Sequence, residues 1–146
     1  ATTITAGTWH TCAVHATGTI SCWGYNGSGA LGNGTTTSSS VPVPVTDITD
    51  ATAITAGLPH TCAIHDTGTI SCWGLGWGSL GDGTTTSSST PVPVTGITDA
   101  TAITAGFHHT CAIHDTGTMS CWGRNDIGQL GDGTTTDSSV PVEVTF

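Results

Sequence analysis

The chain has 146 residues and carries one Lys or Arg against ten Asp and Glu, which gives a formal net charge of −9 at pH 7. Nucleic-acid binding needs a basic surface that neutralises phosphates, so this balance excludes that class of partner and also disfavours an anionic membrane surface. Because no apolar run is long enough for a signal or transmembrane helix, we expect no membrane insertion.

The sequence is one unit written three times. Self-similarity divides it into repeats at residues 1–50, 51–99 and 100–146, with the second contracted by one residue and the third truncated by three. A fixed period of this size is typical of a supersecondary unit that stacks on its own copies. No linker and no separate domain are expected between the repeats.

Each repeat predicts four strands in the same order. In the second repeat they cover residues 51–57, 60–65, 69–73 and 90–95, and the last is matched by 41–46 and 140–145. No segment shows the 3.6-residue period of a helix. The fourth strand alternates valine with proline, and proline cannot donate to a sheet ladder, so it is predicted to be the outer strand.

The second and third strands form a hairpin that places two cysteines opposite each other. Asp66-Thr67-Gly68 suits a three-residue turn with glycine in the left-handed position, which sets Cys62 directly across from Cys72. Opposed Cα atoms lie roughly 4.5 Å apart at such a site. The predicted disulfides are Cys12–Cys22, Cys62–Cys72 and Cys111–Cys121.

These pairs indicate an oxidising compartment, so we expect a secreted or cell-surface protein. Each bridge closes a loop of about ten residues and is worth roughly 2–3 kcal/mol in the chain-entropy model. The alternative is that the six cysteines are reduced core residues.

Residues 122–131, Trp-Gly-Arg-Asn-Asp-Ile-Gly-Gln-Leu-Gly, follow Ala105-Gly106 and His109. This pattern resembles the repeat of the regulator-of-chromosome-condensation family, and the first two copies depart from it at 25–31 and 75–80. The resemblance implies β-propeller blades, usually seven in a closed ring. The added cysteine pair is closest to the exported, bacterial branch of such repeats.

The predicted fold is therefore all-β, with three four-stranded propeller-type blades. Three blades are too few to close a ring alone. We expect the row to be completed by other copies of the chain, joined head to tail in a ring or a filament, or to be a piece of something longer.

No catalytic, cofactor-binding or metal-binding residue is predicted. The G-x-G-x-x-G patterns at 27–32 and 76–81 are not followed by a helix, which a dinucleotide site requires. Zinc at His60 and Cys62 is disfavoured because the cysteine already has a partner. We expect His60 to hydrogen-bond neighbouring backbone, and His108, present only in the third repeat, to lie on the surface.

Several residues are candidates for surface recognition or modification. Trp9, Tyr25 and Trp77 depart from the repeat consensus, which suits recognition hot spots and also suits drift in a scaffold. Asn26 and Asn33 match the N-glycosylation acceptor and also read as Asn-Gly turns. Dense threonine tracts predict either O-linked glycans or plain polar loops; they contain Thr35, Thr36, Thr37, Thr84, Thr85, Thr86, Thr134, Thr135 and Thr136.

The function favoured by the sequence is that of a non-catalytic, extracellular structural repeat protein that assembles with itself. The alternative is an exported binding module for a protein or glycan, similar to the secreted propeller inhibitors of β-lactamases. A nucleotide-exchange factor is disfavoured by the cysteines, and an ultraviolet sensor by the single arginine against five tryptophans. The chromatin role of the family is not expected here.

Overall fold

The computed structural model describes residues 1–146 and is built from twelve β-strands, without helix. It therefore holds no helix of the length and hydropathy needed to cross a membrane. The strands are β1 (Thr3–Ala6), β2 (His10–Val14), β3 (Ile20–Gly24), β4 (Ser39–Pro44), β5 (Ala51–Ala56), β6 (His60–His65), β7 (Ile70–Gly74), β8 (Ser88–Pro93), β9 (Ala100–Ala105), β10 (His109–His114), β11 (Met119–Gly123) and β12 (Ser138–Glu143).

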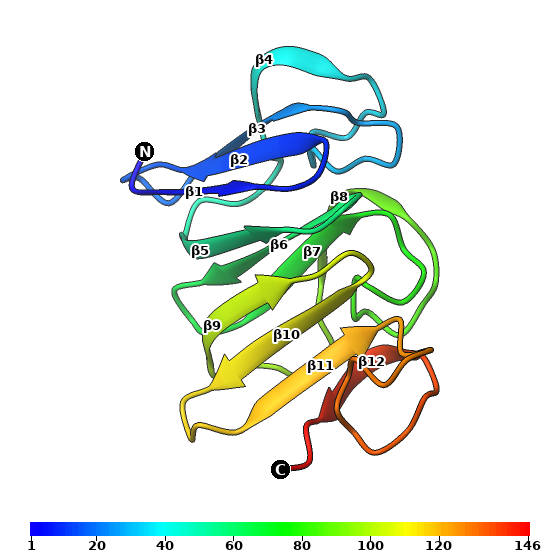
Figure 1. The fold of residues 1–146 in the computed structure, drawn as a ribbon. Helices are drawn as coiled ribbons and strands as arrows, with labels where there is room; N and C mark the ends of the chain where they lie inside the picture. Colours follow the sequence, from blue (N-terminus) through cyan, green and yellow to red (C-terminus); the bar gives the residue numbers. More distant parts are fainter.

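The strands form three antiparallel sheets, each with its four strands in sequence order. We call β1–β4 blade 1, β5–β8 blade 2 and β9–β12 blade 3. The blades follow one another in a row, with the N-terminus at the blade 1 end and the C-terminus at the blade 3 end (Figure 1). The predicted fold class, all-β with three four-stranded blades, is confirmed.

In every sheet, one edge strand contacts the corresponding strand of an adjacent blade, and the other edge strand lies on the opposite side. Strand β5 contacts both β1 and β9, so these three are the inner strands of the row. The proline-containing strands β4, β8 and β12 form the opposite edges, as their missing backbone donors require.

The bounds of these outer strands differ from the prediction by two residues. Strand β8 begins at Ser88 and ends at Pro93, because Ser88 pairs with Gly74 across a register shift and Pro93 pairs with Ser71. Beyond Pro93, Val94 still donates to the carbonyl of Ile70, and the chain then turns toward blade 3. The bulge that moves the register is not visible in the sequence pattern.

The hydrophobic core lies between blades. One cluster joins blade 1 to blade 2 around Trp73, and a second joins blade 2 to blade 3 around Trp122. Both indole side chains are fully buried. Each blade thus depends on its neighbour to cover its apolar face, which is typical of repeat proteins.

Candidate functional site

The cysteines lie opposite each other within each hairpin. Register pairs Cys12 with Cys22, Cys62 with Cys72 and Cys111 with Cys121, and all three pairs are bonded. The Cα–Cα distances are 4.0–4.1 Å, and no free cysteine is left. These are the pairs that the turn register predicts.

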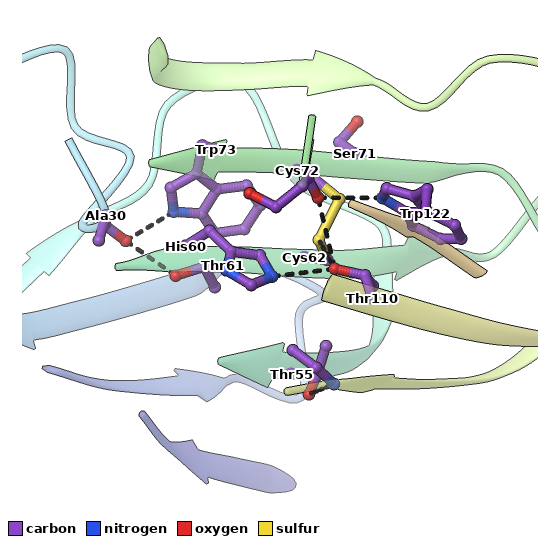
Figure 2. The surroundings of a disulfide bond; sticks show 12 residues. Ala30, Thr55, His60, Thr61, Cys62, Ser71, Cys72, Trp73, Thr110 and Trp122 are labelled. Carbon is purple, nitrogen blue, oxygen red and sulfur yellow. Dashed lines mark hydrogen bonds between the residues drawn. A yellow bond between two sulfur atoms is a disulfide. The ribbon is translucent and has the colours of Figure 1, made fainter. Parts of the chain in front are cut away.

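A hydrogen-bonded chain crosses the joint between blades 2 and 3 (Figure 2). The Nε2 atom of His60, at the start of β6, lies 2.9 Å from the Thr110 hydroxyl on β10. That hydroxyl donates to the carbonyl of Ser79 at 3.4 Å, and the Trp122 indole donates to the same carbonyl at 3.0 Å. The carbonyl and the imidazole come from one blade, and the hydroxyl and indole from the next.

The joint between blades 1 and 2 repeats this arrangement. His10 Nε2 lies 2.7 Å from the Thr61 hydroxyl, which donates to the Ala30 carbonyl at 2.9 Å. The Trp73 indole donates to that carbonyl, also at 2.9 Å. We call this set of His, Thr, Trp and carbonyl the interblade relay.

The relay fixes the protonation of its imidazoles. Since the Thr61 hydroxyl donates its one hydrogen to a carbonyl, His10 must donate Nε2–H to the hydroxyl oxygen. By the same argument His60 donates to Thr110, and its buried Nδ1 has no partner. The sequence expectation that His60 bonds neighbouring backbone is therefore wrong: the partner is a side chain of the next blade.

Burial keeps both imidazoles neutral. Desolvation lowers the pKa of His10 to about 4. Desolvation, assisted by the neighbouring histidines, lowers the pKa of His60 to about 3. A protonated imidazole at either place would sit in a joint that offers it no carboxylate partner.

The Ala-Gly pair before each relay histidine makes room for the ring. A Cβ on Gly57 would lie 2.5 Å from the Gly106 carbonyl and 2.7 Å from Nδ1 of His60. Gly7 meets the Gly57 carbonyl at the same distance. Glycine is thus required here by the close approach of the next blade and not by its own dihedral angle.

Each end of the row carries one unpaired half of the relay. On blade 1, the Thr11 hydroxyl and the Trp23 indole are the counterparts of Thr61 and Trp73; both residues are half-buried, and no hydrogen bond engages either group. On blade 3, His109 Nε2 and the Gln129 carbonyl are the counterparts of the His60 and Ser79 groups, again without partners.

Apolar side chains, such as Ile4 and Ile113, are exposed at the two ends of the row as well. We call the blade 1 surface around Ile4, Thr11 and Trp23 the N-terminal face, and the blade 3 surface around His109, Ile113, Met119 and Gln129 the C-terminal face. The C-terminal face contains a hollow of about 120 Å³, which is lined by Ala102, Ile103, Thr104, Cys111, Ala112, Ile113 and Met119.

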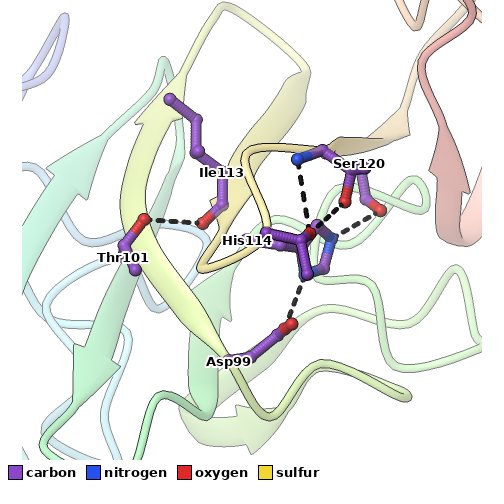
Figure 3. A network of polar contacts seen from close by, with 7 residues as sticks. Asp99, Thr101, Ile113, His114 and Ser120 are labelled. Atoms are coloured by element: carbon purple, nitrogen blue, oxygen red, sulfur yellow. Dashed lines mark hydrogen bonds and ion pairs between the residues drawn. The ribbon is translucent and has the colours of Figure 1, made fainter.

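A second polar network holds the connector between blades (Figure 3). His114 contacts Asp99 through Nδ1 at 2.6 Å and the Ser120 hydroxyl through Nε2 at 2.9 Å. His65 contacts Asp50 and Ser71 at 2.6 and 2.8 Å. The order Asp-His-Ser is that of a hydrolase triad, but neither serine lines any of the three hollows of the surface. The network ties the segment before β5 and β9 to its own hairpin.

Asn26 is a buried loop-organising residue, which favours the turn interpretation of its motif over a glycan acceptor. Its side chain is fully buried; Nδ2 donates to the carbonyls of Thr35 and Thr37, and Oδ1 accepts from Leu31 N. A glycan on Nδ2 would displace these bonds. Asn125 holds the third loop in the same way.

The remaining candidate acceptors lie on the surface. Asn33 is half-buried and accepts from the amide and hydroxyl of Thr35. All nine predicted threonines are exposed, as O-glycosylation would require. The hydroxyls of Thr35, Thr84 and Thr134 donate to the side chain two residues earlier in the loop. Glycosylation at these residues stays a prediction.

The non-repeating aromatics are exposed and form two separate pairs. Trp9 and Tyr25 make an edge contact with ring centroids 5.5 Å apart, and both belong to blade 1. The ring of Trp77 lies 5.0 Å from that of His108, and the ring of Phe107 makes an edge contact with His108 at 4.6 Å.

His108 differs from its expected surface position. It is 7% exposed, because Trp77 and Phe107 cover its ring. Desolvation, followed by the nearby Arg124, lowers its pKa. The sequence missed this contact since its two aromatic partners occur once each and in different repeats.

Models of one known repeat family match most of the chain. A model of the regulator of chromosome condensation (RCC1) repeat matches residues 17–64, 68–113 and 117–146, and a second model of that description matches 1–30 and 100–129. The chain belongs to the RCC1 repeat family. The first two matched RCC1 units run from the hairpin turn of one blade into the hairpin of the next, so each contains the loop carbonyl and the threonine of one interblade relay.

Solved structures show the same fold at low identity. Yeast RCC1 (Prp20), solved bound to Kap60, superimposes with a TM-score of 0.86 at 20% identity, over 99% of this chain and 37% of that one. Human WBSCR16 gives 0.87 at 23%, over 99% and 39%. The Arabidopsis ACR4 CRINKLY ectodomain gives 0.56 at 19%, over 99% and 38%.

The RCC1 repeats present here thus span less than two fifths of the length of these structures. No curated protein sequence matches the chain. At such identities the likeness shows the propeller fold and carries no statement about activity.

Proposed function

We propose that the chain is a non-catalytic, extracellular structural repeat protein whose blade rows assemble with one another. The observation that carries the proposal is the exposure of two apolar blade faces. Ile113 is 39% exposed where its counterpart Ile64 is 3%, and Ile4 is 66% exposed where Ile54 is 9%. Association that covers these faces buries the same side chains that the internal joints bury.

The disulfides support the extracellular part of the proposal. Three bonded pairs in a chain of 146 residues suit an oxidising compartment. The only cation, Arg124, is paired with Asp126, so the proposal includes no nucleic-acid partner.

The test is the oligomeric state of the disulfide-intact chain. Sedimentation velocity over a hundredfold range of concentration should show species larger than the 14.6 kDa monomer that grow with concentration. Native mass spectrometry of the untreated protein reports the copy number and any attached sugar in one measurement. A monomer that keeps native strand content by circular dichroism at the highest concentration contradicts the proposal.

A second candidate function is that of an exported binding module. It is favoured by the exposed aromatics: Trp9 is 57%, Tyr25 44% and Trp77 59% exposed, and aromatic side chains are enriched at recognition hot spots. Screening of immobilised glycans and secreted proteins with the wild-type chain and with Trp77→Ala tests it. Specific binding that is lost in Trp77→Ala, while the assembly state is unchanged, supports the binding module.

A further inference from the structure

The interblade relay is always assembled from two different blades. The preceding blade supplies an imidazole Nε2–H and a loop carbonyl, and the following blade supplies a threonine hydroxyl and an indole N–H. A further hydrogen bond also joins successive blades in a fixed order. The Thr5 hydroxyl of blade 1 accepts from Ala56 N of blade 2, and the Thr55 hydroxyl of blade 2 accepts from Ala105 N of blade 3. The joint therefore has a polarity, from the C-terminal face of one blade to the N-terminal face of the next.

The two ends of the row hold the two halves of one more relay. The C-terminal face offers His109 Nε2–H, the Gln129 carbonyl and the Thr104 hydroxyl, and the N-terminal face offers the Thr11 hydroxyl and the Trp23 indole. No hydrogen bond within the chain engages the side-chain groups of His109, Thr104, Thr11 or Trp23. Each group thus repeats the chemistry and the repeat position of a group that is engaged in both internal joints.

We propose that the C-terminal face of one copy receives the N-terminal face of a second copy head to tail, with His109 donating to Thr11 and with Thr11 and Trp23 donating to the Gln129 carbonyl. This inference rests on the self-assembly proposed above and names its joint.

The apolar parts of the two faces match as the internal joints do. In the joint between blades 2 and 3, Ile64, Ile70 and the Cys62–Cys72 bridge pack against Ala112 and Trp122. The C-terminal face presents Ile113, Met119 and the Cys111–Cys121 bridge in those positions, and the N-terminal face presents Ala13 and Trp23. The joint between copies is thus continuous in composition with the joints inside a copy.

Charge does not oppose the contact. Arg124 and Asp126 line a hollow beside His109 and Gln129, and they pair with each other, so they bring no net charge to the C-terminal face. A second copy fits the C-terminal face better than an unrelated partner because it brings the specific hydroxyl and indole that the relay lacks. The contact is heterologous, so it closes into a ring or extends into a filament.

A charge-swap pair tests the polarity of the contact. Ile4→Lys places a cation on the N-terminal face, and Ile113→Glu places an anion on the C-terminal face; both positions are exposed in the single chain, so folding should be unaffected. Each variant alone should sediment as a smaller species than wild type, and an equimolar mixture should recover assembly in which the two variants alternate.

An isologous contact gives a different pattern. If Ile4 met Ile4 of the partner, Ile113→Glu alone would assemble as wild type does, and the mixture would gain nothing. Either result overturns the head-to-tail joint, while assembly of the wild type would still support the proposed function. A wild type that stays monomeric overturns both.

The relay itself is tested by Thr11→Val, which keeps shape and removes the hydroxyl. It should weaken association about tenfold to a hundredfold, because the His109 imidazole N–H is then buried without an acceptor and the Gln129 carbonyl keeps only the Trp23 indole as a donor. The matched control is Thr67→Val in the exposed hairpin turn of blade 2, far from both faces, which should assemble as wild type does. Wild-type association by Thr11→Val would show that the faces meet without the relay and would overturn this assignment.

Discussion

Lowering the pH from 7 to 5 should destabilise the fold through its buried relay histidines. His10 and His60 are neutral donors in the joints, with pKa values lowered to about 4 and about 3 by burial. In the unfolded chain both return to a pKa near 6.5. Between pH 6.5 and the lowered values, the unfolded state therefore binds more protons than the native state.

The sign and the size of the change in the free energy of unfolding follow from this difference in bound protons. A folded pKa below the unfolded one gives stability that is complete above about pH 6.5 and is lost as the pH falls toward the folded pKa. Because pH 5 lies about 1.5 units below the unfolded pKa, and one unit corresponds to about 1.36 kcal/mol, each histidine lowers the free energy of unfolding by about 2 kcal/mol. The two together lower the free energy of unfolding by about 4 kcal/mol, which is a large part of the stability of a small domain.

Urea unfolding of the non-reduced chain at half-unit pH steps measures this slope. The carboxyl groups with lowered pKa values, Asp99, Asp126 and Asp132, titrate below this window. Burial also lowers the pKa of His108 and of His109, so these two histidines add to the slope in the same direction. His10→Gln should reduce the slope by about one proton. A free energy of unfolding that is constant or rises between pH 7 and 5 would refute the assignment of neutral imidazoles.

Three further predictions follow from single features. Non-reducing peptide mapping should find only bridges within repeats, and reduction of Cys62–Cys72 should cost roughly 2–3 kcal/mol of unfolding free energy; free thiols or a bridge between repeats would contradict the hairpin register. Gly57→Ala should lower thermal stability by about 1–3 kcal/mol, since its Cβ would overlap the Gly106 carbonyl, and wild-type stability would show that the close approach is wrong. Asn125→Ala removes bonds to Leu130 N and two loop carbonyls and should cost about 3 kcal/mol by urea unfolding. The exposed control Asp126→Ala should leave the free energy of unfolding close to that of the wild type, and equal losses for the two variants would refute the loop role of Asn125.

The sequence was sufficient for the repeat, the strands and the cysteine pairs because these depend on local periodicity. Alternation of valine and proline places a strand at the edge of its sheet, and a three-residue turn fixes Cys62 against Cys72. Both follow from the period-2 geometry of a strand, which acts over a few residues. The same local patterns misplaced the ends of β8 by two residues, since the bulge against β7 depends on a neighbouring strand.

The tertiary structure alone decided the partners of the recurring polar residues. Thr61 follows His60 in the chain, yet Thr61 bonds His10 and His60 bonds Thr110, each across about fifty positions of sequence. Their recurrence at one repeat position was the available signal, but recurrence does not say which blade supplies the partner. Asn26 shows the same limit: its acceptor motif is local, whereas its burial is set by loop carbonyls nine and eleven residues away. A sequence determines what each strand offers, and the stacking of blades determines which groups meet, because hydrogen bonds and burial between blades depend on distances that chain order does not fix.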